Sequence, residues 1–112
     1  MRNSIASLGA LLFVSACVRT DYGYVSYRCA RPAAETVDTP EQAVVAARRT
    51  WYCINPSAQE TDEQYWLENY RATSERGVWR VSVQLPEGYA GGGLNMELAQ
   101  NDGKLLNLYI TQ

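Results

Sequence analysis

The N-terminal segment constrains the chain most, because it decides how much of the sequence can belong to a folded domain. Arg2 supplies a positive charge, and the run from Ile5 to Val14 is apolar apart from small residues. This run is too short for a permanent transmembrane helix, which needs about 20 apolar residues. It has the length and the flanking residues of a secretory signal peptide. We therefore predict that residues 1–16 are removed on export and take no part in the fold.

The residues at the end of this segment carry a resemblance. Val14-Ser15-Ala16-Cys17 resembles the lipobox of bacterial lipoproteins, which has an aliphatic residue, two small residues and then a cysteine. The resemblance implies that the Cys17 thiol receives diacylglycerol, that the signal is cut before Cys17, and that the new amino group is acylated. Several acyl chains anchor a protein stably, whereas one chain binds only marginally. The alternative is an ordinary signal peptide followed by a chance cysteine.

The residue after the cysteine indicates which of the two bacterial membranes would hold the protein. Val18, rather than an aspartate, follows Cys17. By the sorting rule of enterobacterial lipoproteins, the resemblance implies transfer to the outer membrane, with the protein facing the periplasm. We expect residues 17–38 to form a lipidated tether and residues 39–112 to form one small domain.

The mature chain is mildly acidic. Without Arg2, nine of the 10 Lys and Arg residues remain against 12 Asp and Glu residues, a net charge of about −3. The chain has no basic cluster, and binding to phosphates needs a positive surface. The composition therefore argues against nucleic acid as a partner.

Two of the three cysteines remain once Cys17 is assigned to the lipid anchor. In an exported protein, an even number of cysteines is typical of disulfides. The distances allow Cys29 to reach Cys53, because a helix from Thr39 to Ile54 would span about 21 Å. The segment from Cys29 to Thr39 can extend about 33 Å, so it can run back along the helix. We predict a Cys29–Cys53 disulfide, and the alternative is two separate buried thiols.

The segment from Thr39 to Ile54 has a complete set of helix signals. Thr39 is a good N-cap, Pro40 suits the first helical position, and Gln42 completes a capping box. Asn55-Pro56 ends the helix. Apolar residues recur at helical spacing: Val44, Ala47, Trp51 and Ile54.

After residue 64 the apolar residues alternate with polar ones, which indicates strands. The alternating runs are residues 78–86, 94–100 and 104–112, with Leu106, Leu108 and Ile110 expected on one face of the last. Residues 65–74 fit either a strand or a helical turn. Asn101-Asp102-Gly103 predicts a hairpin turn. The expected fold class is α+β, with one N-terminal helix packed on a three- to four-stranded antiparallel sheet.

The chain contains no histidine. This excludes Ser-His-Asp and Cys-His catalysis and His-ligated zinc. The remaining candidates for chemistry are carboxylates, which cluster at Glu60, Asp62, Glu63 and Glu68. A paired-carboxylate hydrolase would use such residues, but a solvated acidic loop is the favoured interpretation. We expect a protein that is not an enzyme and that holds no cofactor and no metal.

A partner interface is expected instead. Tyr89 lies in a glycine-flanked loop, which makes it the aromatic residue most expected to be exposed, and exposed aromatic residues are enriched at protein interfaces. The tryptophans Trp51, Trp66 and Trp79 are expected in the core. The candidate interface residues are Tyr89, Glu87, Tyr65 and Glu63.

Residues 39–111 as a whole resemble the NTF2-fold immunity proteins, a family with an NTF2-like (cystatin-like) fold. The stretches that carry the resemblance are the helix that starts Thr39-Pro40-Glu41-Gln42-Ala43 and ends at Trp51, the strand Gly77-Val78-Trp79-Arg80-Val81, the run from Gly91 to Leu98, and Asp102-Gly103-Lys104. The resemblance implies a non-catalytic protein that neutralises a toxin or hydrolase in the periplasm by covering its active site. PepSY-like domains have a similar helix, strand run and DGK turn. The alternative is therefore a PepSY-like or structural envelope lipoprotein without a toxin partner.

Overall fold

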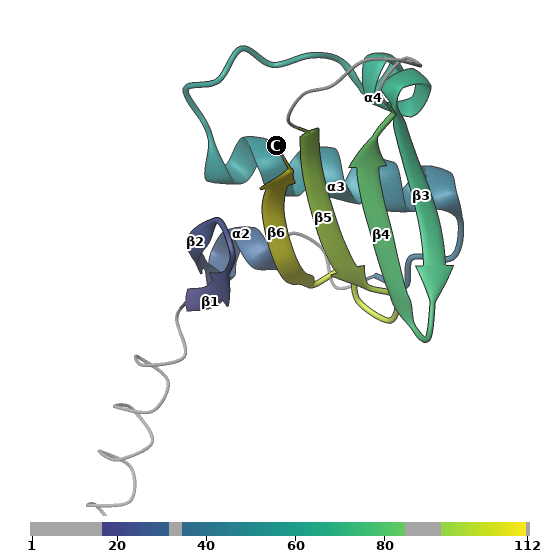
Figure 1. Ribbon diagram of the computed structural model, residues 1–112, viewed down its shortest axis with the longest axis horizontal. Helices are drawn as coiled ribbons and strands as arrows, with labels where there is room; N and C mark the ends of the chain where they lie inside the picture. The colour runs from purple at the N-terminus through teal and green to yellow at the C-terminus, as the bar shows by residue number, and fades with distance from the viewer. Residues whose placement is uncertain (1–16, 32–34, 85–92, 112) are drawn as a thin grey trace, which may run out of the picture.

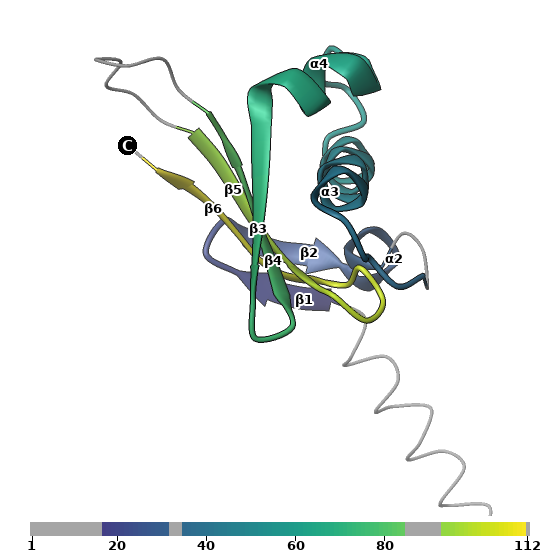
Figure 2. The ribbon, with the colours of Figure 1, turned by 90° about the vertical axis from the view of Figure 1, so that its right-hand side faces the viewer.

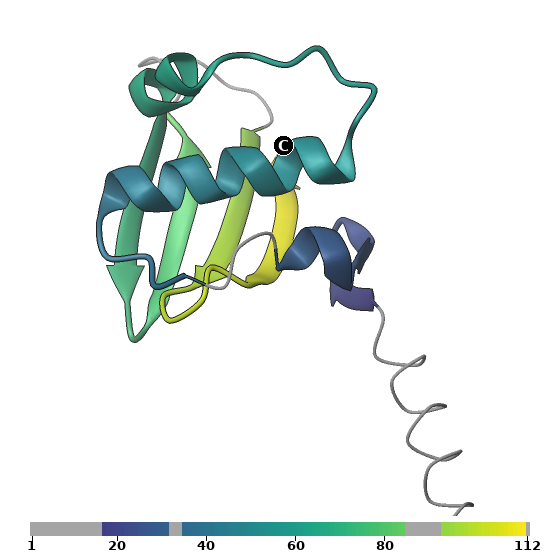
Figure 3. The same ribbon diagram turned by 180° about the vertical axis from the view of Figure 1, so that it is seen from behind.

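The computed structural model describes residues 17–31, 35–84 and 93–111. A four-stranded antiparallel sheet and one long helix form its centre (Figure 1). The strands lie in the order β3 (Tyr70–Glu75), β4 (Val78–Val83), β5 (Gly93–Ala99) and β6 (Leu105–Thr111). The helix α3 (Pro40–Ile54) crosses one face of the sheet, as the view from behind shows (Figure 3). The predicted α+β class with an antiparallel sheet is confirmed.

The helix α3 begins and ends where its sequence signals predict. The Thr39 hydroxyl accepts a hydrogen bond from the backbone N–H of Gln42 (3.1 Å), and the Gln42 side-chain oxygen accepts one from the N–H of Thr39 (3.1 Å). At the other end, the backbone N–H of Asn55 donates to the carbonyl of Trp51 at 2.9 Å. These bonds satisfy terminal groups that would otherwise lack partners, which explains why the helix stops at these residues.

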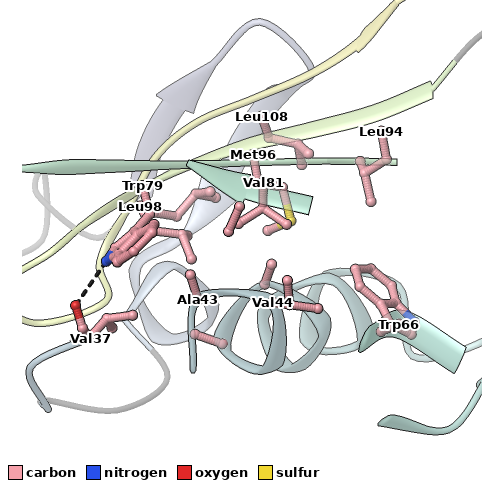
Figure 4. Packing of buried hydrophobic residues seen from close by; sticks show 14 of the residues in the cluster. Val37, Ala43, Val44, Trp66, Trp79, Val81, Leu94, Met96, Leu98 and Leu108 are labelled. Carbon is pink, nitrogen blue, oxygen red and sulfur yellow. Dashed lines mark hydrogen bonds between the residues drawn. The ribbon is translucent and has the colours of Figure 1, made fainter. Parts of the chain in front are cut away.

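The core lies between α3 and the sheet. Ala43 and Val44 point from the helix toward the buried faces of β4 and β5, which contribute Val81 and Met96 (Figure 4). Ala47, one turn along α3 from Ala43, is fully buried. Val81 and Met96 lie opposite each other in neighbouring strands, so one layer of side chains faces the helix. Two of the three tryptophans, Trp66 and Trp79, are buried as expected, and Trp51 is partly buried against the same core.

Residues 65–74 contain both of the structures that the sequence allows. The helix α4 (Glu63–Asn69) begins after Asp62, whose carboxylate accepts a hydrogen bond from the N–H of Tyr65 at 2.8 Å. Strand β3 follows at once from Tyr70. The protein therefore has more helix than the single one expected, because α4 and the short α2 (Tyr27–Ala30) accompany α3.

The segment that the sequence analysis assigns to the tether has regular structure in its described part. β1 (Cys17–Thr20) and β2 (Gly23–Ser26) form a hairpin that leads into α2. The N–H of Tyr22, in the hairpin turn, donates to the carbonyl of Leu108 on β6 at 2.9 Å. Val25 and Ala30 are buried in the same core as α3. The folded domain therefore extends back to Cys17.

Val37 connects the segment before α3 to the sheet. The indole N–H of Trp79 donates to the Val37 carbonyl at 2.8 Å, as Figure 4 shows. The N–H of Val37 in turn donates to the carbonyl of Gln100, also at 2.8 Å. These two bonds fix residues around Val37 beside the turn that joins β5 to β6.

The prediction that Leu106, Leu108 and Ile110 lie on one face of the strand is wrong for Leu106. Glu97 pairs with Asn107, but the next residue, Leu98, pairs with Leu105, so β6 has an extra residue at this point. Such a bulge shifts the alternation of side chains by one residue. Leu105 is consequently buried, whereas Leu106 is 40% exposed and Ile110, near the end of this outer strand, is 43% exposed.

The predicted Cys29–Cys53 disulfide and the predicted turn at residues 101–103 are confirmed. Asn101, Asp102 and Gly103 form the turn between β5 and β6, and Gly103 has a φ of 75°, which glycine adopts without steric cost. A disulfide joins Cys29, in α2, to Cys53, near the end of α3, with a Cα–Cα distance of 5.4 Å. It therefore ties the hairpin and α2 to the main helix.

Removal of this disulfide is expected to destabilise the protein. The bond joins residues that are 24 positions apart and so restricts this loop in the unfolded chain. The variant with both Cys29→Ser and Cys53→Ser should therefore lose about 3 kcal/mol of unfolding free energy. The measurement is urea denaturation followed by tryptophan fluorescence, with the reduced parent protein as the control. An unchanged midpoint in both the variant and the reduced protein would contradict the role assigned to the bond.

The bulge in β6 can be tested with two neighbouring leucines. Leu105→Ala removes a fully buried side chain and should cost about 2–5 kcal/mol. Leu106→Ala changes a side chain that stays partly in water, and it should cost less than about 1 kcal/mol. The same denaturation assay compares the two variants. Equal losses, or a larger loss at Leu106, would show that the register of β6 is different.

Candidate functional site

Two of the four predicted interface residues lie together on α4. Glu63 is the first residue of this helix and is exposed, and Tyr65 is 50% exposed. Glu87 and Tyr89 lie outside the described residues. The strand ends that flank them, at the end of β4 and the start of β5, lie at the same end of the sheet as α4 (Figure 1). The N–H of Gln84 donates to the carbonyl of Asn69 at 2.8 Å, which holds the end of β4 against the end of α4.

A groove of about 250 Å³ lies beside these residues. It is lined by α3, by α4 and by residues 35–37, which lie on either side of α3 in Figure 3. Its apolar lining residues are Val37, Val45, Ala46 and Leu67, and its charged lining residues are Glu35, Glu41, Glu63 and Arg49. The groove thus combines an apolar surface with three carboxylates and one guanidinium group.

The sequence analysis did not identify this groove. The sequence of α3 gives little indication of a groove. Between Glu41 and Arg49, Val45 is the one apolar residue on the otherwise polar side of the helix. The other walls come from α4 and from residues 35–37, which are distant in sequence and lie beside α3 only in the fold. Of the two predicted interface residues that the structure describes, Glu63 lines the groove.

A network of hydrogen bonds holds α4 to α3. The Nε of Arg48 donates to the Thr61 carbonyl at 2.9 Å, and the indole N–H of Trp66 donates to the Thr61 hydroxyl at 2.9 Å. The N–H of Thr61 donates to the phenol oxygen of Tyr52 at 2.9 Å. Because Thr61 lies two residues before the start of α4, these bonds determine where Glu63 and Tyr65 are presented.

The phenol of Tyr52 is affected by this network. Desolvation by burial acts to raise its pKa, but the hydrogen bonds from Thr61 and Trp66 and the nearby Arg48 guanidinium outweigh burial and lower the pKa. The Arg48 guanidinium lies 5.4 Å from the centre of the Tyr52 ring. The arrangement holds Arg48, Tyr52 and Thr61 against one another.

The acidic residues near α4 have structural contacts. Glu60 forms an ion pair with Arg48 at 2.9 Å, Asp62 caps α4, and Glu68 accepts a hydrogen bond from Gln64 at 3.0 Å. Across residues 17–31, 35–84 and 93–111, His, Cys, Asp and Glu side chains do not gather in threes that could hold a metal ion. Glu60 lies in the segment before α4, as the loop interpretation expects, whereas Glu63 and Glu68 lie in the helix itself.

Comparisons with protein-family models, with curated proteins and with solved structures give no match. Among the helices in the described part of the chain, none is long and apolar enough to cross a membrane.

Tyr70 supports α4 from the sheet, and its titration offers a test of this packing. Its ring stacks on Trp66 with a centroid distance of 4.0 Å and an interplanar angle of 7°. Burial, with smaller contributions from Tyr65 and Tyr52, raises the pKa of Tyr70 from 10.0 to about 12. The folded protein therefore keeps this proton more tightly than the unfolded chain does.

The expected consequence is a loss of stability at high pH. Below pH 10.0 the phenol is protonated in both states, so Tyr70 has no effect on the pH dependence. Between pH 10.0 and about 12 only the unfolded chain loses the proton, so the unfolding free energy should fall as pH rises. Urea denaturation across this range should show a shallower fall in Tyr70→Phe. Identical profiles for the two proteins would contradict the burial of this phenol.

Proposed function

We propose that this protein is a lipid-anchored protein of the bacterial outer membrane that binds and neutralises a toxin or hydrolase in the periplasm. The proposal combines a lipid anchor on Cys17 with a partner-binding face formed by α4 and the groove. The observation that carries it is the placement of these two parts. Cys17 begins β1 at one end of the domain, and Glu63 and Tyr65 lie on α4 at the other (Figure 1).

Two observations support the envelope location. Cys17 is exposed, which would leave its sulfur accessible for lipid attachment. Cys29 and Cys53 form a disulfide, and disulfides persist in oxidising compartments such as the periplasm. Together with the lipobox-like Val14-Ser15-Ala16-Cys17, they support export followed by anchoring.

The chemistry of the groove supports a protein partner. Tyr65 offers an exposed aromatic ring, a type of side chain that often contributes strongly to binding. The carboxylates of Glu35, Glu41 and Glu63 surround an apolar surface. A partner segment with basic and apolar side chains would complement both features. A stable interface buries about 1,600 Å² in total, so α4 and the groove would act together.

An NTF2-like identity is part of the same proposal. A long helix across a four-stranded antiparallel sheet supports it at the level of architecture. The same layout also suits a PepSY-like domain, and fold alone is a weak guide to function. The test of the proposal is therefore the partner.

The expected result is the recovery of one secreted hydrolase or toxin, in near-equal amount, by crosslinking and affinity purification of the lipidated protein from its native envelope. Tyr65→Ala should weaken binding of that partner by roughly 30-fold or more if Tyr65 is central to the interface. Glu63→Gln should weaken it to a smaller extent. The matched control is Glu75→Gln, since Glu75 is exposed at the end of β3, away from α4.

Recovery of abundant envelope proteins alone would contradict the inhibitor proposal and would support the PepSY-like or structural alternative. Recovery of one partner that binds Tyr65→Ala as well as the parent would keep the inhibitor role but would remove α4 from the interface.

A further inference from the structure

The β1–β2 hairpin has two chemically different faces. Cys17 pairs with Ser26, and Arg19 pairs with Tyr24. Because successive side chains of a strand point to opposite faces and paired residues share a face, these four side chains lie on the same side. We call this side the outer hairpin face: Cys17, Arg19, Tyr24 and Ser26. All four residues are exposed, and Tyr24 is 76% exposed.

The opposite face of the hairpin belongs to the core. Val25 is 3% exposed and Thr20 is 8% exposed, and Val18 packs against the same cluster of buried residues. The hairpin is further held by the hydrogen bond from Tyr22 to Leu108 and by two bonds between Asp21 and Asn107, of 3.0 and 3.1 Å. The outer face therefore has a defined orientation relative to the rest of the domain.

The proposed lipid attachment site is part of this ordered hairpin. β1 begins at Cys17 itself, so an anchored protein would have no spacer between the lipid and the folded domain. Arg19 lies two residues further along the strand, a distance of about 7 Å. This is within the Debye length of about 8 Å at physiological ionic strength. Salt would therefore only partly screen the electrostatic attraction between Arg19 and the lipid headgroups.

The distribution of charge favours the same orientation. Residues 17–31 contain three arginines and one aspartate, a net charge of +2, whereas residues 32–112 contain six basic and 11 acidic residues, a net charge of −5. Of the three arginines, Arg19 lies on the outer hairpin face, Arg28 is exposed in α2, and Arg31 lies 3.8 Å from Asp102. An anionic membrane would attract the first segment and repel the second. Figure 2 shows β1 and β2 on the other side of α3 from α4.

We propose that the outer hairpin face lies flat on an anionic phospholipid membrane, with Tyr24 among the headgroups and Arg19 on the lipid phosphates. Tyrosine is favoured at the membrane interface because its ring is apolar and its hydroxyl is polar. Arginine forms paired hydrogen bonds with phosphate oxygens. The proposal rests on the lipid anchor at Cys17, and it orients α4 and Tyr65 away from the membrane, toward a partner in the periplasm.

The test uses two of the exposed tyrosines, with Tyr24 as the probe and Tyr65 as the control. The lipidated protein is placed in protein-free vesicles of phosphatidylethanolamine and phosphatidylglycerol, and each tyrosine is iodinated by lactoperoxidase, an enzyme too large to enter the membrane interface. Peptide mass spectrometry gives the rate at each site. Relative to the unlipidated Cys17→Ser protein in buffer, Tyr24 should react several-fold more slowly, and the rate at Tyr65 should stay the same.

Arg19→Gln tests the electrostatic part. It should weaken the contact of the hairpin with these vesicles by roughly fivefold, so that iodination of Tyr24 becomes faster. The matched control, Arg76→Gln in the turn between β3 and β4, should leave the rate at Tyr24 unchanged. Vesicles made only of phosphatidylcholine should abolish the difference between Arg19→Gln and the parent.

The outcomes distinguish a failure of the proposed membrane orientation from a failure of the proposed lipid anchor. Intact mass and flotation with the vesicles report lipidation, and a protein that lacks the lipid would overturn both proposals. A lipidated, vesicle-bound protein in which Tyr24 reacts as fast as in buffer would overturn the orientation alone. Equal protection of Tyr24 and Tyr65 would also overturn it, because α4 would then lie on the membrane too.

Discussion

The packing of α3 on the four-stranded sheet is the contact on which the rest of the structure depends. Ala43, Ala47 and Thr50 have no exposed surface, and their small side chains allow the helix to lie close to the sheet. Burial of apolar surface is the main favourable term in folding, and this layer supplies most of the core. Every other element is attached to α3 or to the sheet that it covers.

Two groups of attachments start from the C-terminal half of α3. The disulfide from Cys53 ties α2, and with it the hairpin that begins at Cys17, to the C-terminal end of the helix. Arg48 and Tyr52 hold the segment before α4 through Thr61. The lipid anchor and the partner-binding face that we propose would therefore be connected through one rigid helix, so the orientation of one end on the membrane would set the orientation of the other.

Several features could be predicted because they depend on residues close together in sequence. The capping box of Thr39 and Gln42, the stop at Asn55-Pro56 and the turn at Gly103 each involve contacts within about four residues. The disulfide could also be predicted, because three cysteines allow few pairings. The groove and the network around Thr61 could not be predicted, because their parts come from α3, α4 and residues 35–37, which only the fold brings together.

By itself, the sequence determined the α+β class, the bounds of α3 and the pairing of Cys29 with Cys53, since helix capping, apolar periodicity and cysteine number are local or countable properties. Only the tertiary structure decided which face each strand residue takes. Leu106 alternates as a core residue should, yet the bulge opposite Glu97 and Leu98 buries Leu105 instead. The pairing register also decided that Cys17, Arg19 and Tyr24 share one exposed face. The physical reason is that the orientation of a side chain in a sheet depends on its partner strand, and that partner is distant in sequence.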